Sequence, residues 1–273
     1  MQKKNSLGKV YLTFVLILLY APIFYLIFYS FNSGSDMSKF TGFTLDNFKT
    51  LFADSRLILI VVQTFFLAFL SSLIATVIGT IGAINLVKLK RRRRETLLGL
   101  NNVLMVSPDV VIGASFLILF TIVGMKLGFI SVLLSHIAFS IPIVVLMVMP
   151  LYQEMDSSLI DAANDLGANS SQIMREIILP YLTPGIIAGF FMAFTYSLDD
   201  FAVTFFVTGN DFTTLSVEIY SRARAGISLE INALSTLVFL FSILLVISPS
   251  EAVMTRIPTK KYNNFFKFLL SIL

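Results

Sequence analysis

The sequence has no cysteine, no tryptophan and one histidine, His136, among its 273 residues. Without cysteine the chain can hold no disulfide framework, no thiol nucleophile and no cysteine-ligated zinc. One histidine is too few for a histidine-based metal site or a histidine dyad, so we expect no metal site. Charge is scarce too, because Asp, Glu, Lys and Arg make up 13% of the residues. That is about half the share found in soluble domains.

Hydrophobic residues make up 56% of the chain, which excludes a disordered protein and indicates a polytopic membrane protein. A helix needs about 20 apolar residues to cross the hydrocarbon core, and six runs approach or exceed that length. The runs are continuously apolar and do not alternate, so they predict helices and not barrel strands. The predicted spans are residues 10–31, 57–87, 97–124, 129–150, 186–207 and 231–249.

The distribution of Lys and Arg predicts the orientation of these spans. With the N-terminus inside, the inner segments hold 14 of the 20 basic residues and the outer segments hold 6. We therefore expect a cytoplasmic N-terminus at 1–9, a six-helix transmembrane domain at 10–250 and a cytoplasmic tail at 251–273. The first span lacks a cleavage site and predicts an uncleaved anchor. The basic run at 88–94 predicts a loop against anionic lipid heads and no nucleic-acid surface.

Acidic residues inside the spans are the main candidates for a substrate path. Asp109, Asp199 and Asp200 lie in apolar runs that contain no Lys or Arg to pair with them. Asp109 is 12 residues from the inner start of its span, or about 18 Å on a straight helix, which is near the midplane. Unpaired acids along an aqueous path suit a cationic cargo, although neutral acids, or caps of a helix broken beside Pro108, fit as well. Consecutive residues sit about 100° apart, so we expect only one of Asp199 and Asp200 to face the path.

Enzyme motifs are missing from the sequence. It holds no G-x-x-x-x-G-K-[ST], no H-E-x-x-H and no complete G-x-S-x-G, so we expect no catalysis by this chain. Two alternatives stay open on the same acids, namely an intramembrane aspartyl hydrolase using Asp109 and Asp199, and a passive cation channel. For His136, a hydrogen bond between helices is favoured over a proton relay.

The inner loop at 151–183 predicts a projecting helix–turn–helix. Ser157 or Ser158 can cap a first helix that has Asp161 in its first turn. Gly167 then turns the chain. A second amphipathic helix follows, and we expect prolines 180 and 184 to end it before the fifth span.

The spacing of this loop resembles the EAA motif of ABC-importer permeases, with Asp in place of the first Glu. Four further stretches, residues 106–109, 135–139, 194–200 and 206–209, are similar to the permeases of spermidine/putrescine importers. In that family the EAA motif forms the helix that docks on a cytoplasmic ATPase. The resemblance assigns this coupling role to Asp161, Ala162, Ala163, Gly167, Ile177, Leu179 and Pro180.

The resemblance implies an all-α, type I ABC importer (MetI-like) fold and ATP-driven polyamine uptake by alternating access in a bacterial inner membrane. It also implies a cytoplasmic ATPase dimer, a second and different permease chain, and an extracytoplasmic polyamine-binding protein. ATP and magnesium are then expected on the ATPase, with no cofactor in this chain. A permease for another small substrate is the remaining alternative within transporters.

Overall fold

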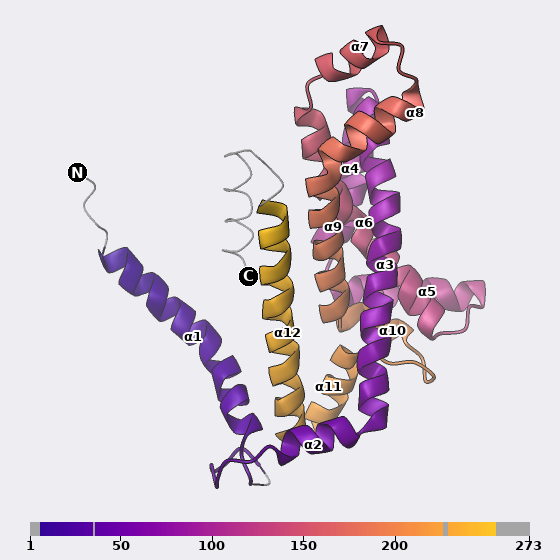
Figure 1. The fold of residues 1–273 in the computed structure, drawn as a ribbon. Coiled ribbons are helices and arrows are strands. Elements are labelled where there is room, and N and C mark those ends of the chain that lie inside the picture. The colour runs from indigo at the N-terminus through magenta and orange to yellow at the C-terminus, as the bar shows by residue number, and fades with distance from the viewer. Residues whose placement is uncertain (1–5, 35, 226–228, 255–273) are drawn as a thin grey trace. The chain divides into compact units, whose positions relative to one another are not determined.

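The structure, a computed structural model, describes residues 6–34, 36–225 and 229–254. Helices dominate these ranges, and the extended backbone in them pairs at one isolated bridge, between Asn32 and Phe43. In chain order the helices are α1 (Ser6–Ser30), α2 (Asp46–Ala53), α3 (Ser55–Lys88), α4 (Arg91–Val106), α5 (Asp109–Val123), α6 (Phe129–Glu154), α7 (Ser158–Asp165), α8 (Ser170–Gln172), the π-helix η1 (Ile173–Ile178), α9 (Leu179–Asp199), α10 (Ala202–Val207), α11 (Leu215–Ala225) and α12 (Leu229–Met254) (Figure 1).

The chain forms two compact units. The first unit joins Met1–Ile58 to Ile219–Leu273, and the second unit is Leu59–Glu218. In the described ranges, four helical segments are long and apolar enough to cross a membrane, and a bent pair makes a fifth. They confirm a helical, multi-spanning chain, whereas the six-span count and the cytoplasmic ends stay predictions. The predicted tail at 251–273 lies outside the described residues from position 255 on.

The third predicted span is a sharply bent pair of helices. α4 and α5 meet at Ser107 and Pro108 and differ in direction by 104°. Pro108 causes the break, because proline has no N–H to donate and disfavours a helical conformation in the residue before it. The depth of Asp109 calculated for a straight helix is therefore wrong.

The core of the second unit is the pairing of α6 with α9. Close approach is possible because Gly185 of α9 faces the other helix. A Cβ atom there would lie 2.8 Å from the backbone oxygen of Met147 and 2.5 Å from the side chain of Leu151. Val144, Val148 and Leu182 are fully buried at this contact. The pair carries His136 on α6 and Tyr196 and Ser197 on α9, which are described below.

The second helix of the inner loop does not end at its prolines, contrary to the prediction. Residues Ser170–Asp199 form one helical segment that includes Pro180 and Pro184. The amide of Leu179 bonds the carbonyl of Met174, five residues back, so a π-turn precedes Pro180. Such a turn accommodates a missing donor without ending the helix. The Thr183 hydroxyl also donates to the Leu179 carbonyl at 2.9 Å.

The fifth predicted span, 186–207, is likewise not one helix. α9 ends at Asp199, the chain turns at Asp200, and α10 starts at Ala202. Helix α10 packs along α5. The acidic pair therefore lies at a helix break and not in the middle of a continuous span.

The first unit is held together by polar contacts in its loop and by packing of α12 on α1 and α2. The Asn32 side chain bonds the backbone of Asp36, Lys39 and Thr41 and so fixes the turn after α1. Arg222 of α11 bonds Asp54 at 2.9 Å. This guanidinium holds the pKa of Asp54 below its usual value.

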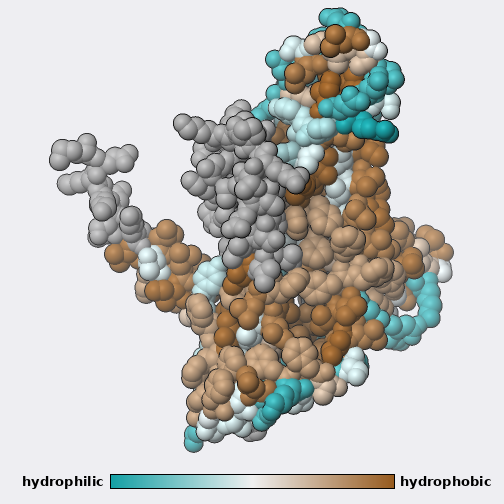
Figure 2. All heavy atoms as spheres, viewed as in Figure 1, coloured by the Kyte–Doolittle hydropathy of each residue, from teal (hydrophilic) through white to brown (hydrophobic). Residues whose placement is uncertain are grey.

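The surface of the second unit changes character along its length. Figure 2 shows hydrophilic residues, in teal, gathered at the end that carries α7 and α8, whereas the surface below is mostly brown and hydrophobic. Exposed apolar side chains on the middle of α3 and on α5, among them Phe66, Val77, Ile118 and Ile122, fit contact with lipid tails. The polar end is the inner loop of the sequence prediction.

Candidate functional site

Asp109 lies at the break between α4 and α5 and is the first residue of α5. An acid in the first turn is favoured there by the unpaired amides of the helix start. The side chain is exposed, and its Oδ1 accepts a hydrogen bond of 2.9 Å from the hydroxyl of Tyr196. Among the described residues no Lys or Arg lies within 4 Å of this carboxylate. The acid at the break is thus held by one neutral donor.

Asp199 and Asp200 differ although they are neighbours. Asp199 ends α9 and is exposed, whereas Asp200 is 9% exposed. The Asp200 carboxylate accepts from the amide of Thr204 at 2.8 Å and from its hydroxyl at 2.7 Å. A longer bond of 3.3 Å comes from the amide of Val203. Asp200 therefore satisfies the free amides at the start of α10, as an N-terminal capping acid does.

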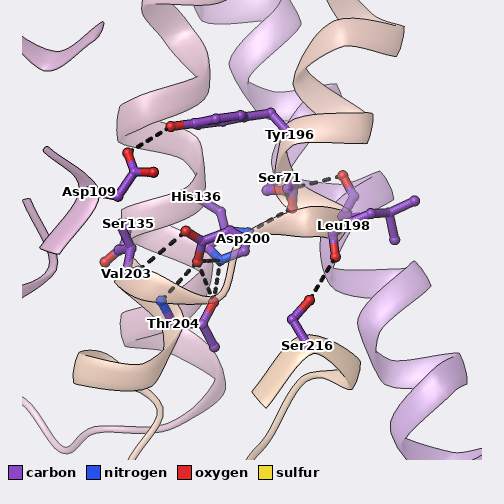
Figure 3. A network of polar contacts seen from close by, with 12 residues as sticks. Ser71, Asp109, Ser135, His136, Tyr196, Leu198, Asp200, Val203, Thr204 and Ser216 are labelled. Carbon is purple, nitrogen blue, oxygen red and sulfur yellow. Dashed lines mark hydrogen bonds and ion pairs between the residues drawn. The ribbon is translucent and has the colours of Figure 1, made fainter. Parts of the chain in front are cut away.

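His136 joins Asp200 in a set of buried side chains that we call the buried polar node: Ser71, His136, Ser197, Asp200 and Thr204 (Figure 3). The imidazole Nδ1 lies 2.6 Å from the Ser197 hydroxyl, and Nε2 lies 2.9 Å from the Thr204 hydroxyl. Nε2 is also 3.5 Å from the Asp200 carboxylate, and Ser71 reaches Ser197 at 3.1 Å. The node links α3, α6, α9 and α10. It confirms His136 as a helix–helix hydrogen-bonding residue.

The hydrogen bonds of the node assign the histidine tautomer. Thr204 gives its single hydroxyl hydrogen to Asp200, so its oxygen can only accept from His136. A neutral ring then carries its hydrogen on Nε2, and Nδ1 accepts from Ser197. In this arrangement each of these buried polar groups has a partner, as burial in an apolar medium requires.

A second group lies next to the node, and we call it the acidic face: Asp109, Tyr196 and Asp199. The Tyr196 ring packs edge-to-face on Phe139, with centroids 5.0 Å apart at 88°. Phe139 in turn lies 4.8 Å from the His136 ring. Phe139 thus lies between the His136 ring of the node and the Tyr196 ring of the acidic face and contacts both.

The inner loop folds as a short helix, a turn and a second helix. Asp156, and not Ser157 or Ser158, caps α7, because its carboxylate accepts from the Ser158 amide at 2.9 Å. This bond lowers the pKa of Asp156. Asp161 lies in the first turn of α7, as predicted. Gly167 has φ +80°, a left-handed conformation that glycine adopts without strain.

The predicted coupling residues are divided between the surface and the core. Ala163 is buried, and α7 packs against η1. Leu159 and Leu166 are exposed, Leu166 by 89%. The exposed members of the predicted set are Asp161, Ala162, Gly167, Leu179 and Pro180, and Ile177 is half-buried.

Sequence reasoning missed Tyr196, Ser197 and Thr204. A signal was present, because these polar side chains lie in otherwise apolar runs and Tyr196 comes three residues before Asp199. Polar residues within spans commonly bond between helices. Which partners they find depends on how α6, α9 and α10 pack, and the sequence alone does not show this.

Comparisons with known proteins agree with this architecture. The family described as "Binding-protein-dependent transport system inner membrane component" matches residues 75–260. The chain is 38% identical over 238 residues to the spermidine/putrescine transport system permease protein PotC of Escherichia coli strain K12, covering 87% of this chain and 90% of the relative. The PotC protein of Haemophilus influenzae is 35% identical over 246 residues, covering 90% and 93%.

A solved structure of a bacterial ABC transporter that imports the acidic polysaccharide alginate shares the fold. Its TM-score is 0.70 at 16% identity, and the match covers 92% of this chain and 95% of that chain. This likeness bears on the fold alone and carries no information on the cargo.

Proposed function

Because the chain belongs to the family of inner-membrane components of binding-protein-dependent transport systems, we propose that it is the translocation subunit of a polyamine importer. The observation that carries the proposal is the identity of 35% and 38% to two spermidine/putrescine permeases over nearly their whole length. As a family member, the chain is a multi-pass protein of the bacterial inner membrane.

The acidic face supports a cationic cargo. Asp109 and Asp199 are exposed, whereas Asp200 is engaged by α10 and His136. An ionised acid within a membrane is costly unless it meets water or a partner charge. During transport, Asp109 and Asp199 attract the ammonium groups of the polyamine, and Asp200 stabilises the chain turn between α9 and α10.

The inner loop supports coupling to a separate ATPase. Leu159 on the short helix α7 and Leu166, which directly follows it, are exposed apolar side chains at a polar end of the second unit. Such a helix suits docking in a groove of another protein. We propose that an ATPase dimer receives α7, and that ATP and magnesium bind to that dimer. A second permease chain and an extracytoplasmic binding protein complete the importer.

Uptake of labelled spermidine and putrescine tests the proposed cargo. Cells that carry the whole importer should take up polyamine, and cells that lack only this chain should lose that uptake. Unchanged uptake without the chain, or import of a different substrate alone, would remove the polyamine assignment.

The coupling role is tested with Gly167→Asp. A side chain at φ +80° strains the turn, and a new charge at a docking surface is costly, so uptake should fall with normal amounts of protein in the membrane. Gly124→Asp is the matched control, because Gly124 has a similar left-handed φ of +74° and lies outside the inner loop, so the same strain and charge are added away from the proposed docking surface. Normal uptake by a fully expressed Gly167→Asp protein would contradict docking at this turn.

A further inference from the structure

Tyr196 combines an aromatic ring, a hydroxyl bonded to a carboxylate and partial exposure. Its hydroxyl lies 2.9 Å from Asp109 Oδ1, and the residue is 38% exposed. We propose that Tyr196 and Asp109 form an alkylammonium-binding subsite, in which the hydroxyl positions the carboxylate and the ring contacts the cargo. This inference rests on the proposed function and adds a residue to it.

The first part of the subsite is a carboxylate with a fixed orientation. Tyr196 occupies one lone-pair site of Oδ1, and a carboxylate offers about four such sites, so acceptor capacity remains for an ammonium. Without the hydroxyl, the exposed Asp109 side chain at the start of α5 would rotate freely. The hydroxyl therefore reduces the conformational entropy that the Asp109 side chain loses when an amine binds.

The second part is the aromatic ring. Phe139, itself 3% exposed, holds the Tyr196 ring edge-to-face, so the ring cannot swing into the core. An ammonium or its adjacent methylene groups can then lie against the accessible part of the ring. A carboxylate beside an aromatic surface matches both the charge and the apolar chain of an alkyl amine.

The third part is a second carboxylate on the same helix. Asp199 lies three residues after Tyr196, and residues at this spacing are neighbours on a helix surface. Asp199 is exposed, as Tyr196 is. The set therefore offers Asp199 as a second carboxylate, three residues from Tyr196 on α9, which suits a cargo with at least two amines.

Two variants separate the hydroxyl from the ring. Tyr196→Phe removes the hydroxyl and keeps the contact with Phe139, whereas Tyr196→Leu removes both. Tyr25→Phe is the matched control, because Tyr25 also loses a hydroxyl bond, here to the Met37 carbonyl in the first unit. The probe is labelled spermidine, and the measurement is its dissociation constant for the purified permease–ATPase complex in lipid nanodiscs without binding protein.

The expected loss of affinity is graded. Tyr196→Phe should weaken binding about fivefold, the effect of one net hydrogen bond. Tyr196→Leu should weaken it roughly 30-fold, because the ring contact is lost as well. In an Asp109→Asn background the further effect of Tyr196→Phe should shrink, since the hydroxyl acts through the carboxylate. Tyr25→Phe should bind as the unaltered protein does.

The outcomes distinguish this inference from the proposed function. If the unaltered complex does not bind spermidine, the subsite is overturned, whereas the proposed function is decided by the uptake experiment with the whole importer. If it binds spermidine and both Tyr196 variants bind equally well, only the subsite is overturned. A Tyr196→Leu protein that assembles normally and keeps full affinity excludes the ring contact even where Tyr196→Phe fails to assemble.

Discussion

The buried polar node and the acidic face lie side by side in the second unit, yet the aspartate carboxylate is buried in the node and exposed in the acidic face. Asp200 in the node is almost fully buried and accepts hydrogen bonds from Thr204. Asp199, the preceding residue, is exposed at the end of α9. Identical side chains next to each other thus have different surroundings because the helix ends between them.

The difference follows from the cost of a carboxylate in an apolar medium. A buried acid must find donors, and Asp200 finds them in the first turn of α10 and in the node. An acid that stays exposed keeps its charge available. The break between α9 and α10 is therefore the feature that separates the buried, hydrogen-bonded acid from the exposed acid that we propose to meet cargo.

The largest expected effect comes from removing the buried acid. Asp200→Ala leaves the Thr204 amide and hydroxyl without their acceptor, which should lower the free energy of unfolding by about 2–4 kcal/mol. Asp200→Asn should cost less, since asparagine also caps helices well. The midpoint of thermal unfolding of the purified complex measures both. Asp199→Ala is the control and should leave the midpoint unchanged; equal losses at both positions would refute the distinction between the two acids.

The next effect tests the packing that connects the two regions. Gly113 of α5 faces α10, and a Cβ atom there would lie 2.8 Å from Phe206 and 3.0 Å from the Cα atom of Val203. Gly113→Ala should therefore push α5 and α10 apart. We expect this to lower the free energy of unfolding by about 1–3 kcal/mol. The control Gly99→Ala meets nothing within 4 Å and should be neutral or slightly stabilising. Unfolding midpoints compare the two; equal midpoints would show that α5 and α10 can separate without cost.

Substitutions in the acidic face should lower polyamine uptake and leave the midpoint of thermal unfolding unchanged. Asp109→Asn and Asp199→Asn keep size and polarity but remove charge, so uptake should fall roughly 5- to 150-fold, as for the loss of a contact worth about 1–3 kcal/mol. Spermidine, with more charge, should lose more than putrescine. Uptake of both amines is measured at matched membrane levels, with unfolding midpoints as the control. Normal uptake in both variants would show that neither exposed acid meets the cargo.

Hydropathy was enough to predict the helices but not the breaks between them. Long apolar runs can satisfy their backbone only as helices, so α3, α6 and the body of α9 follow from composition and length. The 104° bend at Pro108 does not, because proline favours a break without fixing its angle. The angle depends on where α5 packs along α10.

The same limit applies to the site. The sequence placed three acids in spans, and the 100° rule predicted that Asp199 and Asp200 would face different ways. The sequence could not show which of the two is buried. Residues 201–207 continue the apolar run, so no change in hydropathy marks the start of α10. His136 was predicted to bond between helices, but its partners, Ser197 and Thr204, come together only in the folded chain.

The smallest expected effect is at an exposed ion pair, which tests whether burial, and not charge alone, gives the node its importance. Lys126, between α5 and α6, bonds Asp211, between α10 and α11, at 2.6 Å, and both side chains are mostly exposed. The pair raises the pKa of Lys126 and lowers that of Asp211. Its contribution is therefore complete at neutral pH. It is lost only as the pH falls through the lowered pKa of Asp211 or rises through the raised pKa of Lys126.

Water and salt screen such a pair, so Asp211→Asn should shift the unfolding midpoint by less than about 2 °C at pH 7. Any shift should shrink further when the salt concentration is raised, because exposed charges are screened over about 10 Å or less. Midpoints at low and high salt, for the unaltered and Asp211→Asn complexes, measure this. A large shift that persists at high salt would mean that an exposed pair stabilises the second unit as the node does, and that burial does not separate the two kinds of acid.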